Sequence, residues 1–391
     1  MARSKLVILL LLFVTVQARS VQTVASRECG SSYVVNADNS VSFCYCGAGK
    51  RVEVVGDFQY TGKDSSRYSD MRMRKVPMER GSDGCFHART LCLVPETYTY
   101  CFRVDGKYVT DEQNNDSAWQ TTRKWSILSL SGTRPTELYL PPEVQGEVIH
   151  SQWYDREACV NRRVYIYLPA AYRRASEGER FPVLYLLHGI NGYEGSWTER
   201  GRAIQIIENL IAEGSVSPMI VVMPDCNTRV EEGRASHRSL WNNVWHYPGH
   251  CRDHSLELAM EDLMAHVDSC YRVSGRCVIA GFSLGARNAA NIVNRYPGRF
   301  EAVGIFSPVV SKKQQPQTDI PYYIYTGQED MFVRNGRRFH RRLAANGVEH
   351  EYVETGGGHT WRSWREQLVL FLISTVCTNR YPSATGFPKA A

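Results

Sequence analysis

After residue 20, the chain of 391 residues has no apolar run long enough to cross a bilayer as a helix. It has no H-E-x-x-H signature of a zinc hydrolase, and Cys44-Tyr45-Cys46 is one residue short of a C-x-x-C redox or zinc pair. The chain also has little excess of positive over negative charge. Its net charge is only +6, and the basic residues are dispersed along the sequence. No nucleic-acid-binding motif accompanies this charge. The sequence therefore predicts no metal, no cofactor, no nucleic-acid partner and no stable membrane span.

An apolar segment does occur at the beginning of the chain. Arg3 and Lys5 precede an uncharged run from Leu6 to Val16, and Ala18 offers a small residue to a signal peptidase. Eleven apolar residues are too few to span a bilayer comfortably, so we predict a cleaved signal peptide and a secreted or periplasmic protein. All twelve cysteines follow this segment, and an even number in an exported chain favours disulfide bonds of open connectivity.

The most informative motif is G-x-S-x-G from Gly281 to Gly285, with Ser283 at its centre. An apolar run (277–280) precedes it and a helical run (286–296) follows it. In this context the motif is typical of a strand-to-helix turn whose glycines leave room for the neighbouring backbone. The helix N-terminus then faces the reacting atom. We predict that Ser283 is a nucleophile at the edge of a mostly parallel α/β sheet.

A nucleophilic serine needs a base, and the base needs an acid that orients it. Two strand-like runs downstream of Ser283 end in suitable turns, the first containing Glu329 and Asp330 and the second containing His359. The expected order along the chain is serine, acid, histidine. We therefore predict a catalytic triad of Ser283, Asp330 and His359. The alternatives are Glu329 as the acid, and His359 as a loop residue that only caps a helix.

Attack of a serine on a carbonyl also needs two N–H donors for the developing oxyanion. A buried-strand run from Phe181 to Leu187 enters a loop that in such sheets supplies one donor, and the residue after the nucleophile supplies the other. We assign these donors to the backbones of Ile190 and Leu284. His188 lies in the same loop, and we interpret it as shaping the turn by local hydrogen bonds rather than as a second catalytic histidine.

The length of the chain indicates two domains. In residues 97–104, large apolar side chains occur at every second position, which places Tyr98, Tyr100 and Phe102 on one face of a strand. The next two residues, Asp105-Gly106, are a favoured hairpin turn. Short strands of this kind predict a β-sandwich. The predicted division is a signal peptide (1–18), an N-terminal segment (19–40), a β-sandwich (41–130), a linker (131–147), an α/β domain (148–380) and a tail (381–391).

An insertion between Asp225 and Leu256 is rich in aromatic and histidine residues. Because it follows a strand end, we expect it to overhang Ser283 and to bind an aromatic or sugar group. The predicted substrate-binding residues are Trp197, Trp241, Trp245 and Trp361. The alternative for each tryptophan is that it only packs a loop against the body of the domain.

The same insertion raises two further questions, whether it binds a metal and whether it contains a disulfide bond. His246, His250 and His254 have a spacing that would align them on a helix, but a Pro-Gly pair interrupts that helix, so we predict no metal site. A disulfide between Cys226 and Cys251 would close a loop of about 26 residues and hold the insertion still. The alternative is that each cysteine pairs elsewhere or stays reduced as a small buried hydrophobe.

From about Val164 to Leu372 the chain resembles the esterase D branch of the α/β-hydrolases, which includes carbohydrate esterase family 1. The matching phrases are residues 163–169, 185–189, 209–214, 218–224, the G-x-S-x-G turn and 357–361. This resemblance implies an α/β-hydrolase fold and a serine esterase without a cofactor. Residues 55–58 and 102–106 resemble early-set immunoglobulin-like modules akin to starch-binding family 48.

The resemblance implies hydrolysis of carboxylic esters, with feruloyl or acetyl esters on plant-cell-wall carbohydrate as the favoured substrates. Siderophore esters of the enterochelin type and acyl transfer to a sugar are the alternatives within the same branch. A non-enzymatic carbohydrate-binding protein is disfavoured, because every catalytic position is filled. In the predicted sandwich, Trp119 and Trp125 could stack on sugars, although burial in the core is the commoner role of such residues.

Overall fold

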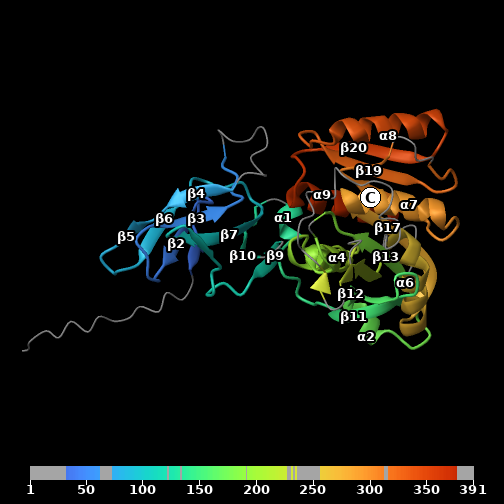
Figure 1. The fold of residues 1–391 in the computed structure, drawn as a ribbon, viewed down its shortest axis with the longest axis horizontal. Coiled ribbons are helices and arrows are strands. Elements are labelled where there is room, and N and C mark those ends of the chain that lie inside the picture. Colours follow the sequence, from blue (N-terminus) through green and yellow to red (C-terminus); the bar gives the residue numbers. More distant parts are fainter. Residues whose placement is uncertain are drawn as a thin grey trace, which may run out of the picture. The chain divides into compact units, whose positions relative to one another are not determined.

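The computed structural model describes residues 32–61, 73–120, 123–132, 134–190, 192–226, 230–231, 234–235, 256–311 and 316–376 (Figure 1). These residues form an antiparallel β-domain, followed in the chain by an α/β domain with an eight-stranded sheet. None of the helices in these ranges is long and apolar enough to cross a membrane.

The N-terminal domain contains two antiparallel sheets. One has the strand order β1-β2-β6-β5, and the other has the order β4-β3-β7-β10-β9 with β8 beside β7. The strands are β1 Tyr33–Val35, β2 Val41–Tyr45, β3 Val52–Gly56, β4 Arg74–Pro77, β5 Glu79–Arg80, β6 Phe86–Arg89, β7 Thr97–Val104, β8 Lys107–Val109, β9 Ser117–Gln120 and β10 Arg123–Ser129. Side chains from both sheets share one core, in which the rings of Phe43 and Tyr100 lie 5.0 Å apart. The predicted all-β domain ahead of the α/β domain is confirmed.

The predicted hairpin also forms, because its turn suits the two residues that occupy it. Asp105 has φ 47° and Gly106 has φ 87°. Positive φ at both central residues is the type I′ geometry that matches the twist of paired strands. Val104 then pairs with Lys107 across the turn.

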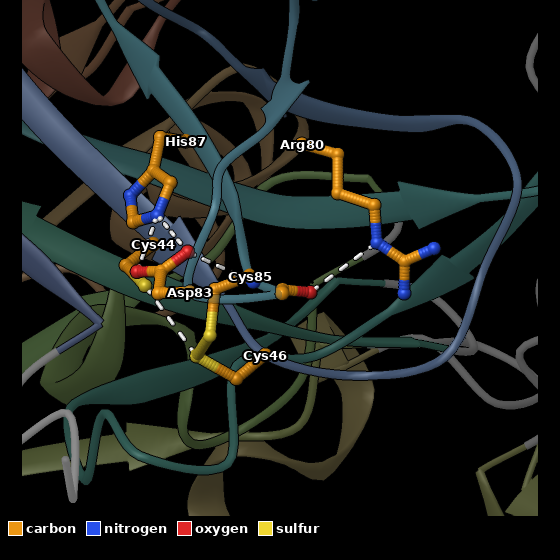
Figure 2. The surroundings of a disulfide bond; sticks show 7 residues. Cys44, Cys46, Arg80, Asp83, Cys85 and His87 are labelled. Carbon is orange, nitrogen blue, oxygen red and sulfur yellow. Dashed lines mark hydrogen bonds and ion pairs between the residues drawn. A yellow bond between two sulfur atoms is a disulfide. The ribbon is translucent and has the colours of Figure 1, made fainter. Parts of the chain in front are cut away.

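One disulfide joins the two strands that pair at the middle of the first sheet. Cys46 follows β2 and Cys85 precedes β6, and the bond links them over 39 positions of sequence (Figure 2). In the chain-entropy model, closing such a loop in the unfolded chain raises the free energy of unfolding by about 4 kcal/mol. The sulfur of Cys44 lies 3.6 Å from that of Cys46, and Asp83 pairs with His87 close by at 3.0 Å.

The α/β domain is built on a sheet with the strand order β11-β12-β14-β13-β17-β18-β19-β20. β12 is antiparallel to both β11 and β14. The other neighbours in this sheet, in the order β14-β13-β17-β18-β19-β20, are parallel. The strands are β11 Glu147–Asp155, β12 Val160–Leu168, β13 Phe181–Leu187, β14 Ile220–Pro224, β17 Val273–Phe282, β18 Ala302–Phe306, β19 Tyr322–Gly327 and β20 His350–Thr355. The segment between β14 and α6 contains a short pair, β15 Val230–Glu231 and β16 Arg234–Ala235. The carboxyl ends of the parallel strands meet at one edge, where such sheets place their chemistry.

Helices cover both faces of this sheet. α6 (Leu256–Cys270), α7 (Leu284–Arg295) and α8 (Val333–Ala345) contribute to one hydrophobic core, and α4 (Ala203–Ala212) and α9 (Trp361–Thr375) contribute to the other. The described residues of this domain also include three short helices, α1 Arg134–Glu137, α2 Ala170–Arg174 and α3 Ser196–Glu199. Burial on both faces explains why strands such as β13 read as continuous apolar runs.

The segment predicted as a linker, residues 131–147, has secondary structure and buried side chains among its described residues. It contains α1, and Leu138 and Tyr139 are buried in the core to which α9 contributes. The side-chain amide of Asn209 on α4 donates to the carbonyls of Leu138 and Leu140, each at 3.1 Å. The middle of this segment is therefore a packed part of the α/β domain.

The predicted disulfide between Cys226 and Cys251 is wrong at its first cysteine. Cys226 is a fully buried thiol whose sulfur donates to the carbonyl of Pro224 at 3.4 Å. It belongs to the apolar core beneath β14, where a cysteine packs as a small hydrophobe. Cys251 lies outside the described residues.

Candidate active site

The strand-to-helix turn at Ser283 has the tight geometry that its glycines predict. β17 ends at Phe282, α7 begins at Leu284, and Ser283 between them has φ 55° and ψ −113°. A Cβ on Gly281 would lie 2.6 Å from the backbone of Gly285, and one on Gly285 would lie 2.5 Å from the carbonyl oxygen of Leu187. Only glycine fits at these two positions without moving backbone.

Three side chains from separate loops meet in a hydrogen-bonded series. His359 Nε2 lies 3.1 Å from Ser283 Oγ, and His359 Nδ1 lies 3.0 and 3.2 Å from the two carboxylate oxygens of Asp330. Asp330 follows β19 and His359 follows β20, so all three residues come from the carboxyl edge of the sheet. The structure thus brings together the three residues predicted as a triad, and the carboxylate that pairs with His359 is that of Asp330 rather than Glu329.

The surroundings of Asp330 stabilise its charged form. Its side chain hydrogen-bonds His359 and accepts the Phe332 backbone N–H at 2.7 Å, and the Ser307 side chain is a further donor that lowers its pKa. Burial alone would raise the pKa of this carboxyl, but the hydrogen bond and attraction to His359, with the other two donors, hold the pKa of Asp330 below its usual value. Asp330 is therefore equipped to remain an acceptor that orients the imidazole.

The loop predicted to supply an oxyanion donor lies directly beside the nucleophile turn. Leu187, the last residue of β13, is in register with Gly281 on β17. A Cβ on Gly189 would lie 2.4 Å from the ring of Phe282, so the loop packs against the residue before the nucleophile. Ile190 is the next residue of this loop, and Leu284 is the first residue of α7. This placement is compatible with both predicted donors.

His188 joins two backbone segments behind this loop. Its Nδ1 lies 2.7 Å from the carbonyl of Gly189, and the N–H of Cys226 donates to its Nε2 at 2.8 Å. The Asp225 carboxylate, 3.4 Å from Nε2, favours a charged ring, whereas burial opposes one. Because Nε2 accepts the Cys226 N–H, the neutral ring protonated at Nδ1 is the form that satisfies both backbone groups. These bonds agree with the predicted role of shaping the turn.

A partly buried ion-pair cluster lies against the same loop. Arg163 at the beginning of β12 contacts Glu194 at 3.1 Å and Asp225 at 3.6 Å. Burial and the nearby Asp225 raise the pKa of Glu194 above its usual value, although Arg163 opposes this shift. The cluster connects β12, the end of β14 and the loop after β13, which helps to fix the loop that contains Ile190.

Aromatic rings pack around His359 and the nucleophile turn. The ring of Trp364 stacks on Phe282 with centroids 3.8 Å apart and meets His359 edge-on at 5.0 Å. Phe332 also lies 5.0 Å from His359. Trp361, predicted to bind substrate, is half-buried and lies 4.8 Å from Phe282. It remains a candidate for substrate contact.

Trp197 has a different position from the one expected of a substrate-binding residue. It is 1% exposed, and its indole N–H donates to the carbonyl of Leu187 at 3.1 Å. The ring therefore ties α3 to the end of β13 and has no surface for a ligand. Trp241 and Trp245, as well as the three insertion histidines, lie outside the described residues. In the β-domain, Trp119 is 49% exposed and Trp125 is buried.

Sequence reasoning missed Ser307 and Trp364. Ser307 directly follows the apolar run of β18, and a polar residue just after a parallel strand is the signal that could have identified it. Trp364 lies one helical turn after Trp361, where it resembles an ordinary core position of an amphipathic helix. Trp364 donates a hydrogen bond to Ser307, but the two residues are 57 positions apart in the chain, so no local pattern reveals this contact.

Comparison with known proteins identifies the family. Residues 159–374, more than half of the chain, match the family described as "Putative esterase". The chain belongs to this esterase family. A curated relative, the endo-1,4-beta-xylanase/feruloyl esterase of Xylanibacter ruminicola, is 28% identical over 211 residues. That match covers 52% of this chain, and the chain spans only 28% of the relative's length.

Two solved structures share the fold. The CE1 ferulic acid esterase of Anaeromyces mucronatus has a TM-score of 0.53 and 23% identity, with coverage of 61% of this chain and 95% of that chain. The enterobactin esterase of Shigella flexneri has a TM-score of 0.58 and 17% identity, with coverage of 86% of this chain and 92% of that chain. The protein is thus an α/β-hydrolase of an esterase family.

Proposed function

We propose that Ser283, His359 and Asp330 hydrolyse carboxylic esters by nucleophilic catalysis. The observation that carries this proposal is the hydrogen-bonded series from Ser283 Oγ through both ring nitrogens of His359 to Asp330. Ser283 Oγ attacks the ester carbonyl while His359 Nε2 takes the hydroxyl proton. His359 then returns that proton to the departing alcohol. Water, activated by the same nitrogen, releases the acid from the acyl-enzyme and restores the Ser283 hydroxyl.

The negative charge on the tetrahedral intermediate needs donors that are already in place. We assign these to the backbone N–H groups of Ile190 and Leu284. The packing of Gly189 against Phe282 and the position of Leu284 at the first turn of α7 support the assignment. Donors of this kind act from a rigid framework and so reorganise little during the reaction.

For the substrate, we propose feruloyl or acetyl esters on plant-cell-wall carbohydrate. The name of the Xylanibacter ruminicola relative supports this substrate class. The half-buried ring of Trp361 beside the nucleophile turn supports a flat or apolar group at the site. Trp241 and Trp245 stay in this proposal as further contacts. We also propose that the protein is secreted or periplasmic, which the Cys46–Cys85 disulfide supports.

A siderophore ester is the second candidate, and coverage of the chain favours it. The enterobactin esterase structure matches 86% of this chain, whereas the ferulic acid esterase structure matches 61%. The likeness to the former thus extends beyond the α/β domain into the β-domain. Under this reading the substrate would be a catecholate ester rather than a carbohydrate ester.

Hydrolysis of p-nitrophenyl acetate by wild type and Ser283→Ala tests the mechanism. The variant should stay folded and lose on the order of a million-fold in turnover, because it lacks the nucleophile. A panel of methyl ferulate, acetylated xylan and a catecholate siderophore then discriminates the substrates. Retention of more than roughly a tenth of wild-type activity in the variant would exclude Ser283 as the nucleophile.

A further inference from the structure

Ser307 has an unusual position beside the candidate triad. It follows β18 directly, is completely buried and has φ 48° without being glycine. Its N–H donates to the carbonyl of Tyr325 on β19 at 2.8 Å, and the carbonyl of its neighbour Phe306 accepts the N–H of Ser283 at 2.9 Å. Left-handed backbone costs a non-glycine residue free energy and is found where neighbouring contacts impose it. The end of β18 is therefore held between the nucleophile and the strand that leads to Asp330.

The donors and acceptors around Ser307 determine the direction of its hydroxyl. The indole N–H of Trp364 donates to Ser307 Oγ at 2.9 Å, and an indole nitrogen can only donate. A carboxylate that carries its negative charge can only accept, and the Ser307 side chain is one of the donors that lower the pKa of Asp330. Ser307 has one hydroxyl proton, so it accepts from Trp364 and donates to Asp330.

Trp364 is itself held by the rest of the site. It stacks on Phe282, the residue before the nucleophile, and meets the ring of His359 edge-on. It is 7% exposed, so water does not compete freely for its N–H. The indole N–H of Trp364 is thus positioned by contacts with Phe282 and His359, which belong to the candidate active site.

We propose that Ser307 is a positioning residue for Asp330 and that Trp364 sets the direction in which Ser307 donates. This inference rests on the proposed function, since it extends the series Ser283, His359, Asp330 by two residues that touch no substrate. The third donor holds the carboxylate in the plane that suits His359 and takes up part of its charge. Without this donor, the carboxylate would be free to turn, and more of its charge would act on the imidazolium.

The test is the pH dependence of kcat in Ser307→Gly. Glycine suits the positive φ, so this variant removes the hydroxyl without adding backbone strain. We expect kcat to fall roughly ten-fold with KM nearly unchanged, because the lost contact acts in the transition state. The pH of half-maximal kcat on the acid side should rise by about half a unit, because an unshared carboxylate charge holds the imidazolium proton more strongly.

Trp364→Phe supplies a second, independent variant. It keeps a six-membered ring that can stack on Phe282 and removes the five-membered ring with the indole N–H that orients Ser307. The acid-side midpoint should shift in the same direction by a smaller amount. Ser374→Ala is the matched control, because Ser374 lies near the far end of α9, close to Tyr325, and should change neither kcat nor the midpoint.

Two results would overturn the proposal. In the first, Ser307→Gly retains the wild-type kcat and pH profile while Ser283→Ala is inactive, which refutes the positioning role and leaves the triad intact. In the second, both Ser307→Gly and Trp364→Phe lose kcat without any shift in the midpoint, which indicates a structural role only. Thermal unfolding of each variant shows whether it is folded, and if Ser307→Gly is not, Trp364→Phe decides the question.

Discussion

Ser283 illustrates how a single residue is placed by its neighbours. Its φ of 55° is costly for a residue with a side chain, and the turn keeps it because Gly281 and Gly285 approach each other too closely for any Cβ. The N–H of Ser283 is fixed to Phe306 on the next strand. The hydroxyl is therefore positioned by backbone contacts, and the side chains nearby only complete the site.

Asp330 predicts how stability depends on pH. Its folded-state pKa lies below the ordinary value of about 3.9 in the unfolded chain, so its ionisation stabilises the folded state above that pH. This contribution is lost as the pH falls from about 4 through the folded-state pKa. The free energy of unfolding in urea should thus fall further between pH 6 and pH 3 in wild type than in Asp330→Asn.

Asp319→Asn is the control for this measurement, because Asp319 is exposed. Its pH dependence should follow that of wild type. Identical pH dependence in wild type and Asp330→Asn would show that the folded structure does not favour the charged form of Asp330.

At the scale of elements, α7 and β13 approach each other closely at the site. A Cβ on Gly285 would lie 2.5 Å from the Leu187 carbonyl oxygen and 2.7 Å from that of His188. Both are backbone atoms, so Gly285→Ala must move α7 away from the oxyanion loop. We expect a loss of about 1–3 kcal/mol in the free energy of unfolding and a larger relative loss in kcat.

Gly178→Ala is the matched variant, because no heavy atom lies within 4 Å of the Cβ that it would gain. It should leave both the unfolding midpoint in urea and kcat at wild-type values. Wild-type kcat in Gly285→Ala would mean that the spacing between α7 and the oxyanion loop does not matter to the reaction.

Elements with strong local signals could be predicted from the sequence. The strand at residues 97–104, its Asp105-Gly106 turn and the strand–turn–helix around Ser283 each depend on residues close together in the chain. The roles of Trp197 and Cys226 could not be assigned in this way. Whether a tryptophan after a glycine-rich loop faces a ligand or the core depends on distant packing, and so does the pairing of a cysteine.

At the scale of the molecule, a buried ion pair joins the two domains. Arg365 on α9 donates to Glu96 at 2.7 Å and to the carbonyl of Thr97 at 3.0 Å, and the charged side chains are only 3% and 6% exposed. The same guanidinium donates to the carbonyl of Arg200 at 2.7 Å. The sequence contained no signal for this pair, because its members are 269 positions apart.

Removing one partner of this pair should leave a buried charge without its main counter-ion. We expect Arg365→Met to lower the free energy of unfolding by about 3–5 kcal/mol. Arg365→Met combined with Glu96→Gln should cost less than the sum of the single changes. Urea unfolding followed by circular dichroism measures all three variants.

Arg276→Met is the comparison, because Arg276 pairs with Glu301 at the surface and both side chains are more than 40% exposed. It should cost at most about 1 kcal/mol. If Arg365→Met is no more costly than this exposed pair, the buried contact contributes little to holding the domains together.

The pairing of β13 with β17 has a consequence for variation among relatives. Leu187 lies opposite Gly281 although the chain between them includes α4, β14 and α6. Backbone pairing, and not the intervening chain, sets the distance between the oxyanion loop and the nucleophile. The connection after β14 can therefore lengthen, shorten or change its residues while the reacting groups keep their spacing. Related proteins can therefore differ in the ester that they bind while the catalytic mechanism stays the same.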